Sequence, residues 1–280
     1  MSSKIEDFWD LLKTLRVLAS HPEGVRTTTK SSGLGISTLC LAEAELGTAL
    51  EYLVGRTELV EIVSEGYHDI TKHLEVAESF SGEFKYSIHS PYIGLDIANI
   101  RESLRRESLE VIEGTLKSSS ELNPVMFVVH PGMIAGKHLK EDNAKALKKS
   151  VTYLNKLSEE YSIPIALENM PLKFLFLTKP EEIELIDGLK FCLDVGHANI
   201  TKKLDEFLLV ERIDHVHLHD NGGNVDEHLG IGKGKIDMKK VFRGIYNHNP
   251  KPNIILELAN GDDVDPSIKK ISEISHSFEC

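Results

Sequence analysis

Residues that can bind metal ions recur in this sequence at the ends of short apolar runs. The segments KYSIHSPY, VMFVVHPG, IPIALENMP, KFCLDVGHAN, DHVHLHDN and IILELAN each place a histidine or a carboxylate after several apolar residues, and NVDEHLGIGKGKID adds two more. The candidate ligands are His89, His130, Glu168, Asp194, His197, His217, Asp226, His228 and Glu257. Imidazole and carboxylate groups are preferred ligands of Zn²⁺ and Mn²⁺, so a metal centre is the chemistry to expect.

The charge of these candidates supports the same interpretation. Four carboxylates cannot share a small volume unless cations neutralise them, and three divalent ions would do so. Any one of the histidines, taken alone, is commonly an ordinary core or surface residue, but their joint occurrence at one end of successive runs favours a cluster. Four other histidines have no such placement and are interpreted as ordinary: His21, His138, His248 and His276. His68 and His73 follow the second run and could reach the same end, but they too are interpreted as ordinary.

The apolar runs have the length and composition of buried parallel strands. Eight occur in order, at residues 35–40, 59–64, 85–89, 125–130, 163–168, 190–194, 215–219 and 253–257. Helical periodicity is found between them at 100–119, 141–160, 180–186 and 238–246, and at 267–278 after an Asp265 N-cap and Pro266. These units predict an α/β fold, the (β/α)8 TIM barrel, because in an open sheet the polar strand ends would gather at one switch point.

Strand alternation predicts which side chains face the barrel interior. His215, His217 and His219 share one face of their strand, whereas Val216 and Leu218 share the other, which suits packing against helices. The histidines should therefore point inward, and the same alternation turns His130, Asp194 and Glu257 inward. We expect His215 to be a hydrogen-bonded core residue beneath the metal layer, and His219 to support the ligands or touch substrate.

Residues 1–32 precede this barrel domain, which is expected at 33–280. Ile5, Phe8, Trp9, Leu12 and Leu15 fall at helical spacing, so the segment predicts an amphipathic helix that packs on the barrel or on a subunit partner. Its acidic residues do not resemble a signal peptide, and no apolar run is long enough to cross a bilayer. A cytoplasmic protein without a membrane partner is the expectation, and the oligomeric state stays open.

Composition excludes one class of partner. The 280 residues include 32 Lys+Arg and 44 Asp+Glu, so the formal charge is 32 − 44 = −12. A chain this acidic is not expected to coat nucleic acid non-specifically, although a local basic surface stays possible. Cys40, Cys192 and Cys280 are too scattered for a disulfide framework and are interpreted as reduced thiols.

From residue 35 onward these residues and their order resemble the xylose isomerase-like TIM barrels, which include endonuclease IV and sugar isomerases and epimerases. In the isomerase and epimerase branch one metal ion is held by Glu, Asp, His and Glu, matched here by Glu168, Asp194, His217 and Glu257. Endonuclease IV adds five ligands and holds three zinc ions. The resemblance implies one ion on His89, His130 and Glu168 and a third on His197, Asp226 and His228. The second ion is implied on Asp194, His217 and Glu257, with Glu168 as a bridge to the first.

The resemblance also suggests substrate residues. Tyr92 and Ile93 match an aromatic and aliphatic pair that endonuclease IV inserts beside an abasic site in DNA. Lys137 and Lys233 are candidates for phosphate contacts. The arginine-containing stretch that endonuclease IV carries after its second strand is replaced here by Glu65-Gly-Tyr-His-Asp69, so a small sugar or sugar phosphate stays open as the substrate.

Two enzyme classes follow from these residues. In a metal-dependent phosphodiester hydrolase that cleaves abasic-site DNA, Glu168 and Glu257 position the attacking water. In a sugar or sugar-phosphate isomerase or epimerase, the same two carboxylates flank the substrate carbon and move its proton. A purely metal-storing barrel is the third alternative. Zinc, up to three ions, is the expected cofactor, with manganese as the other candidate.

Overall fold

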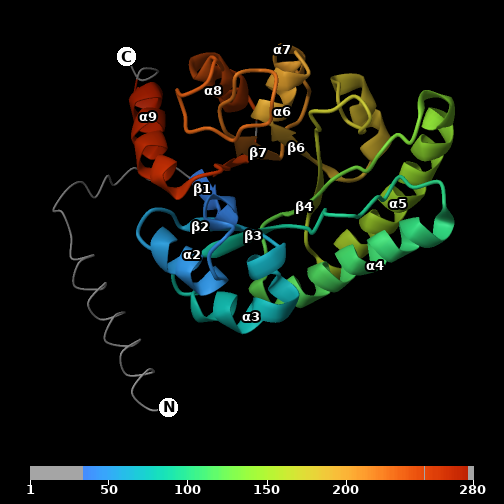
Figure 1. Cartoon of the computed structure of the whole chain (residues 1–280), viewed down its shortest axis with the longest axis horizontal. Coiled ribbons are helices and arrows are strands. Elements are labelled where there is room, and N and C mark those ends of the chain that lie inside the picture. The colour runs from blue at the N-terminus through green and yellow to red at the C-terminus, as the bar shows by residue number, and fades with distance from the viewer. Residues whose placement is uncertain (1–33, 249, 277–280) are drawn as a thin grey trace. The chain divides into compact units, whose positions relative to one another are not determined.

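The computed structural model describes residues 34–248 and 250–276. Eight parallel strands close into a barrel in which each strand pairs with its neighbours in sequence and the last pairs with the first (Figure 1). They are β1 (Leu34–Ser37), β2 (Leu59–Val63), β3 (Lys85–His89), β4 (Phe127–Val129), β5 (Ile165–Glu168), β6 (Lys190–Asp194), β7 (His215–Leu218) and β8 (Asn253–Leu256). The predicted (β/α)8 TIM barrel is confirmed.

Helices connect successive strands. The α-helices are α2 (Leu46–Leu53), α3 (Ile70–Ser79), α4 (Glu102–Ser119), α5 (Lys140–Tyr161), α6 (Val195–Ile200), α7 (Leu204–Phe207), α8 (Met238–Tyr246) and α9 (Val264–His276). Short 3₁₀ helices are η1 (Thr38–Leu41), η2 (Gly66–His68), η3 (Ser120–Leu122), η4 (Lys137–Leu139), η5 (Pro180–Ile186) and η6 (Gly261–Asp263). Within the described residues no helix has both the length and the apolar character needed to cross a membrane.

Three sequence predictions of local structure need correction. The first strand ends at Ser37, whose side chain accepts from the amide of Leu39 and starts a 3₁₀ turn. Residues 180–186 form a 3₁₀ helix. The last helix begins at Val264, so Asp265 and Pro266 lie inside its first turn, where proline is tolerated because those amides need no helical partner. The helix predicted within 1–32 lies outside the described residues.

The barrel has two apolar layers of unequal size. A large cluster fills the space between the strands and the helices, whereas the interior holds a small cluster of Met126, Val128, Ala166 and Cys192. Two residues farther along β5 and β6 the next inward positions are Glu168 and Asp194, both buried. The upper interior, where a barrel usually packs branched aliphatic side chains, is therefore filled by ionisable groups.

Candidate metal centre

The nine predicted ligands meet at the C-terminal ends of the strands. Six are at or directly after strand ends: His89, His130, Glu168, Asp194, His217 and Glu257. His197 lies on α6, and Asp226 and His228 lie in the loop between β7 and α8. Together with His219 they form three groups, and in each group one potential ligand atom from every residue lies within 4.8 Å of those of the others.

The first group consists of His89, His130 and Glu168. Both imidazole Nε2 atoms lie 3.3 Å from Oε2 of Glu168. Nδ1 of His89 donates to the carbonyl oxygen of Ser90, at 2.8 Å, so Nε2 is the nitrogen that faces the carboxylate. The side chain of His130 is a quarter exposed, so this group borders the solvent.

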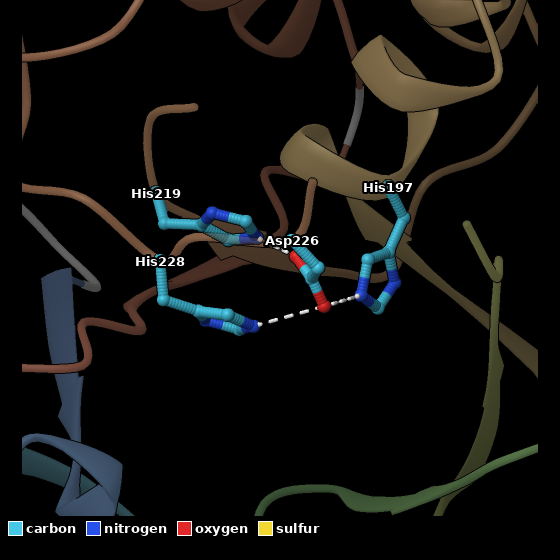
Figure 2. A group of neighbouring side chains, drawn as sticks. All are labelled: His197, His219, Asp226 and His228. Atoms are coloured by element: carbon cyan, nitrogen blue, oxygen red, sulfur yellow. Dashed lines mark hydrogen bonds and ion pairs between the residues drawn. The ribbon is translucent and has the colours of Figure 1, made fainter. Parts of the chain in front are cut away.

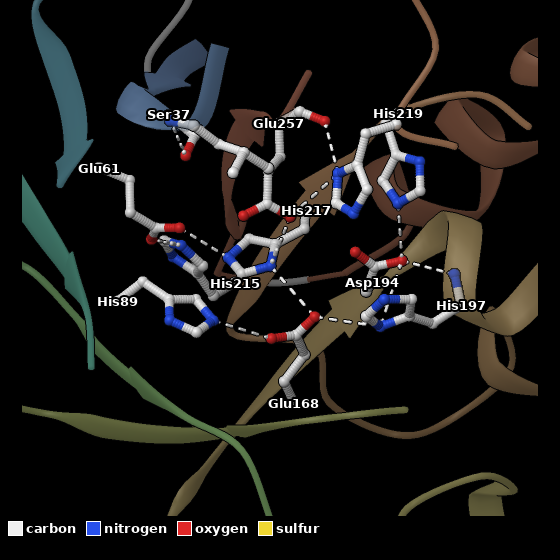
Figure 3. Close-up of polar contacts among 12 residues, drawn as sticks. Ser37, Glu61, His89, Glu168, Asp194, His197, His215, His217, His219 and Glu257 are labelled. Atoms are coloured by element: carbon white, nitrogen blue, oxygen red, sulfur yellow. Dashed lines mark hydrogen bonds and ion pairs between the residues drawn. The ribbon is translucent and has the colours of Figure 1, made fainter. Parts of the chain in front are cut away.

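The second group, Glu168, Asp194, His217 and Glu257, lies deeper (Figure 3). Nδ1 of His217 lies 3.3 Å from Oε1 of Glu168 and 3.4 Å from Oε2 of Glu257. Glu168 thus turns one oxygen to each of the first two groups. Among the described residues, Oδ2 of Asp194 and Nδ1 of His217 have no hydrogen-bond partner although both are buried.

The third group, His197, His219, Asp226 and His228, is carried by α6 and by the segment that follows β7 (Figure 2). Oδ2 of Asp226 lies 2.9 Å from Nε2 of His197 and 3.3 Å from Nε2 of His228. Nδ1 of His197 donates to the carbonyl of Asn169, at 2.8 Å, and Nδ1 of His228 donates to that of Glu257, at 3.1 Å. Each ring therefore turns its other nitrogen toward Asp226.

His219 is the fourth member of this group, a place that the ligand pattern alone did not assign to it. Its ring stacks on that of His228 with centroids 3.9 Å apart, and its Nε2 lies 3.2 Å from Oδ1 of Asp194. The His219 ring can lie this close to α6 only because residue 196 is glycine, since a Cβ at that position would lie 2.0 Å from Cε1 of His219. His219 thereby links the second and third groups.

The donor atoms fit divalent ions by three criteria. The groups combine imidazole nitrogens with carboxylate oxygens, the set that suits zinc or manganese. Tetrahedral ligands at about 2.0–2.1 Å from an ion lie about 3.3–3.4 Å from each other, and the contacts of 3.3–3.4 Å in the first two groups match this spacing. The buried, unpartnered atoms of Asp194 and His217 point to a missing positive partner.

The charges of the centre are strongly coupled. Burial disfavours ionisation of Glu168, but the neighbouring imidazoles, His217 first, hold its pKa well below the usual range. Burial likewise disfavours a charged His197, yet Asp194 and Asp226 raise its pKa well above the usual range. In the metal-free protein, protonated imidazoles thus supply part of the positive charge that bound ions would bring.

The predicted substrate residues are placed less uniformly. The Tyr92 ring lies 4.8 Å from that of His130, and Ile93 is 71 % exposed. Both backbone amides donate to one oxygen of Glu65, at 2.7 and 2.8 Å, which fixes this loop beside the first group. Lys137 is exposed on η4. Lys233 forms an ion pair with Asp263, so its ammonium group is already engaged.

A cavity of about 710 Å³ opens beside the third group. Tyr92, Asp226 and His228 line one part of it, and η1 and Asn260 line another. Lys137 and Lys233 are not among its lining residues. The cavity gives a substrate access to the third group from the solvent.

A family model described as xylose isomerase-like TIM barrel matches residues 60–276. The chain belongs to this family. An uncharacterized protein of Methanocaldococcus jannaschii is 33 % identical over 249 residues, covering 86 % of this chain and 98 % of the relative. A probable endonuclease 4 of Finegoldia magna is 28 % identical over 232 residues, covering 75 % and 81 %. The solved structure of a D-tagatose 3-epimerase-like protein superposes with a TM-score of 0.78 at 27 % identity, covering 87 % and 97 %.

Glu61 is the polar residue of this xylose isomerase-like barrel that the strand-end pattern missed. It lies in the middle of β2 and is fully buried, with its carboxylate 2.8 Å from Nε2 of His215 and 2.8 Å from Nε2 of His217 (Figure 3). His215 is a buried, hydrogen-bonded histidine, as its strand position suggested. The available signal was a single charge within the apolar run LVEIV.

Proposed function

We propose that this protein is a metal-dependent phosphodiester hydrolase of the endonuclease IV type, with abasic-site DNA as its substrate. The observation that carries the proposal is the third group, which joins His197, His219, Asp226 and His228 beside the first two. A single-ion isomerase needs only the second group. Extra ligand sets suit a reaction that must balance charge on both the attacking and the leaving oxygen.

Each group would hold one ion, with Glu168 shared between the first and the second. Zinc is the favoured ion because the sites mix imidazole and carboxylate ligands, and manganese is the alternative. Bound ions would make water more acidic and neutralise the phosphate. Glu168 and Glu257, which flank Nδ1 of His217, would accept hydrogen bonds from the attacking water and orient it.

Tyr92 and Ile93 are the proposed substrate contacts beyond the centre. The Tyr92 ring adjoins both histidines of the first group, so a sugar or base at the centre would meet its face. Lys137 could approach a phosphate from η4, whereas Lys233 would first have to leave Asp263. Because His219 belongs to the third group, it would contact only substrate atoms that reach that group.

An epimerase or isomerase is the second candidate function. The similarity to a D-tagatose 3-epimerase-like protein over 87 % of this chain favours it. In that reaction the second group would hold one ion, and Glu168 and Glu257 would exchange a proton with the substrate carbon between them. His89, His130 and His228 would then bind sugar hydroxyls.

Removal of Asp226 separates the two functions. With zinc-loaded protein and a duplex that contains one abasic site, we expect Asp226→Ala to lower kcat for strand cleavage by about 10²–10³-fold, as loss of charge stabilisation in a transition state does. Glu257→Ala should abolish cleavage. Parallel assays with ketoses and their phosphates measure the alternative reaction.

An exposed aspartate on α5 provides the matched control. Asp142→Ala removes a carboxylate that only pairs with Lys145, so cleavage should be unchanged. The isomerase would be the better assignment if the wild type converts a sugar but does not cleave DNA. In that case sugar turnover should persist in Asp226→Ala and be lost in Glu257→Ala.

A further inference from the structure

A second polar layer lies beneath the metal centre, inside the barrel. Glu61 on β2 and His215 and His217 on β7 are all fully buried. β2 pairs with β1 and β3, whereas β7 pairs with β6 and β8, so these side chains meet across the interior and not along one edge. Glu61 is therefore a carboxylate in the protein core with two imidazoles as its charged or polar partners.

The two nitrogens of His217 have different surroundings. Nε2 lies 2.8 Å from Oε1 of Glu61, within hydrogen-bond distance although the N–H direction is not well aligned in this arrangement. Nδ1 lies 3.3 and 3.4 Å from oxygens of Glu168 and Glu257, the spacing of ligands around one ion. One side of the ring thus faces a proton acceptor and the other faces the centre.

The other oxygen of Glu61 receives a hydrogen bond from His215. Oε2 lies 2.8 Å from Nε2 of His215. A buried carboxylate is costly unless it is paired and hydrogen-bonded. Burial disfavours its ionisation, but His217 and His215 outweigh this and hold the pKa of Glu61 well below the usual range. One carboxylate oxygen thus accepts from His215, and the other lies at hydrogen-bond distance from Nε2 of His217.

A fourth ion between Glu61, His215 and His217 fits the geometry less well. A neutral imidazole has one nitrogen with a free electron pair, so His217 cannot bind an ion on both sides while it keeps its proton. The contacts of 2.8 Å have the length of hydrogen bonds between nitrogen and oxygen. A shared proton explains the short distances directly.

We propose that Glu61 is a positioning residue of the metal centre. Its carboxylate accepts a hydrogen bond from Nε2–H of His217, so that Nδ1 of the ring stays available as the metal ligand. The inference rests on the proposed metal centre and holds for either enzyme class. A carboxylate behind a ligand histidine orients the ring and raises its basicity, and loss of such a partner costs about 10–100-fold in metal affinity.

The first test needs no substitution. In protein labelled with ¹⁵N-histidine, long-range proton–nitrogen spectra report which ring nitrogen carries the proton. We expect His217 to be protonated at Nε2 in the metal-free and the zinc-loaded protein, with its signals identified by their loss in His217→Gln. A neutral His217 ring whose single proton lies on Nδ1, or a zinc-loaded ring without a proton at Nε2, would overturn the proposal, whatever reaction the enzyme catalyses.

The second test is zinc affinity by competition with a chromophoric chelator. Glu61→Met keeps the length of the side chain and removes both acceptors, so we expect 10–100-fold weaker binding of the zinc ion at the second group. Glu61→Gln is less decisive, because its amide could still accept from His217 while it donates to another tautomer of His215.

Ser87→Ala is the matched control. Ser87 is the β3 residue in register with Glu61, and its buried hydroxyl has no hydrogen-bond partner among the described residues. We expect zinc affinity within threefold of the wild type for this variant. The proposal would be overturned if folded Glu61→Met bound zinc as tightly as the wild type. It would also be overturned if the wild type bound a fourth zinc ion that Glu61→Met does not bind. If the protein does not cleave DNA, that result contradicts the proposed hydrolase function and not the role of Glu61.

Discussion

Three candidate ligand histidines are oriented by hydrogen bonds to backbone carbonyls. The carbonyls of Ser90, Asn169 and Glu257 accept from Nδ1 of His89, His197 and His228. In each ring the Nδ1 proton is thereby held by a backbone carbonyl, and Nε2 faces a carboxylate. Since the acceptors belong to the backbone, the rings are preorganised before any ion arrives, which reduces the ordering that metal binding requires.

The protonation of His228 predicts how metal binding depends on pH. Burial disfavours the charged ring, but the hydrogen bond with Asp226 and nearby carboxylates raise the pKa of His228 to about 9. At pH 7 the metal-free ring is therefore charged and must lose a proton to bind an ion. We expect zinc affinity to rise by about tenfold per pH unit for each proton released, up to about pH 9.

Calorimetry in buffers of different ionisation enthalpy measures this proton release. At pH 7 His197 and His228 should each release a proton when the third-group ion binds, and His228→Gln should lower the release by about one proton. His138→Ala, which alters an exposed histidine outside the centre, should keep it. Equal zinc affinity at pH 6.5 and pH 8.5 would contradict the assigned charge of His228.

Sequence alone identified the residues of the centre that follow apolar runs. That pattern works because a barrel brings the ends of its strands to one rim. It missed Glu61, which lies within a strand, and it could not tell whether His219 faces an ion or substrate. Those placements depend on contacts across the barrel and on the space at Gly196, which no local pattern encodes.

At the scale of elements, Gly196 allows α6 to lie close to His219, which directly follows β7. Gly196 lies in the first turn of α6 directly against the His219 ring. Gly196→Ala would place Cβ 2.0 Å from Cε1 of His219, so the helix or the ring must move. We expect a loss of about 1–3 kcal/mol in the free energy of unfolding, as for other overpacked sites.

Urea denaturation provides the measurement, and α4 provides a matched glycine. A Cβ at Gly114 meets no atom within 4 Å, so Gly114→Ala should stabilise by about 0.5–1 kcal/mol. The loss in Gly196→Ala should be accompanied by weaker zinc binding at the third group. Wild-type stability in Gly196→Ala would show that α6 can shift freely.

The elements themselves were largely predictable, and their ends were not. The strands at 85–89 and 190–194 and the helix at 238–246 have the predicted bounds. β2, β4, β7 and β8 end one residue before their predicted ends. Turn chemistry at Ser37 ends β1 sooner than its apolar run suggests.

At the scale of the whole molecule, the ligands of the first two groups connect six of the eight strands, from β3 to β8. Ions bound there would join segments far apart in the sequence and favour the folded state. At a free zinc concentration 100 times Kd, one site adds about 2.7 kcal/mol. For a barrel of this size each kcal/mol raises Tm by about 2–4 °C.

Scanning calorimetry with zinc and with chelator tests this linkage. We expect chelation to lower Tm by at least 5 °C, and Asp194→Ala to lose most of that difference. Magnesium, which prefers oxygen ligands, should stabilise less than zinc. A Tm that is the same with and without zinc would show that the groups do not bind the ion tightly.

The third group differs from the other two in how it is attached to the barrel. Apart from His197 on α6, its members lie in the segment after β7, and Asp226 and His228 belong to the connecting loop before α8. An insertion or deletion there would remove both in one genetic event and leave every strand intact. The first two groups change only through substitutions in the barrel wall. Proteins with this architecture can therefore gain or lose the third group through a change in one loop, while the first two groups stay unchanged.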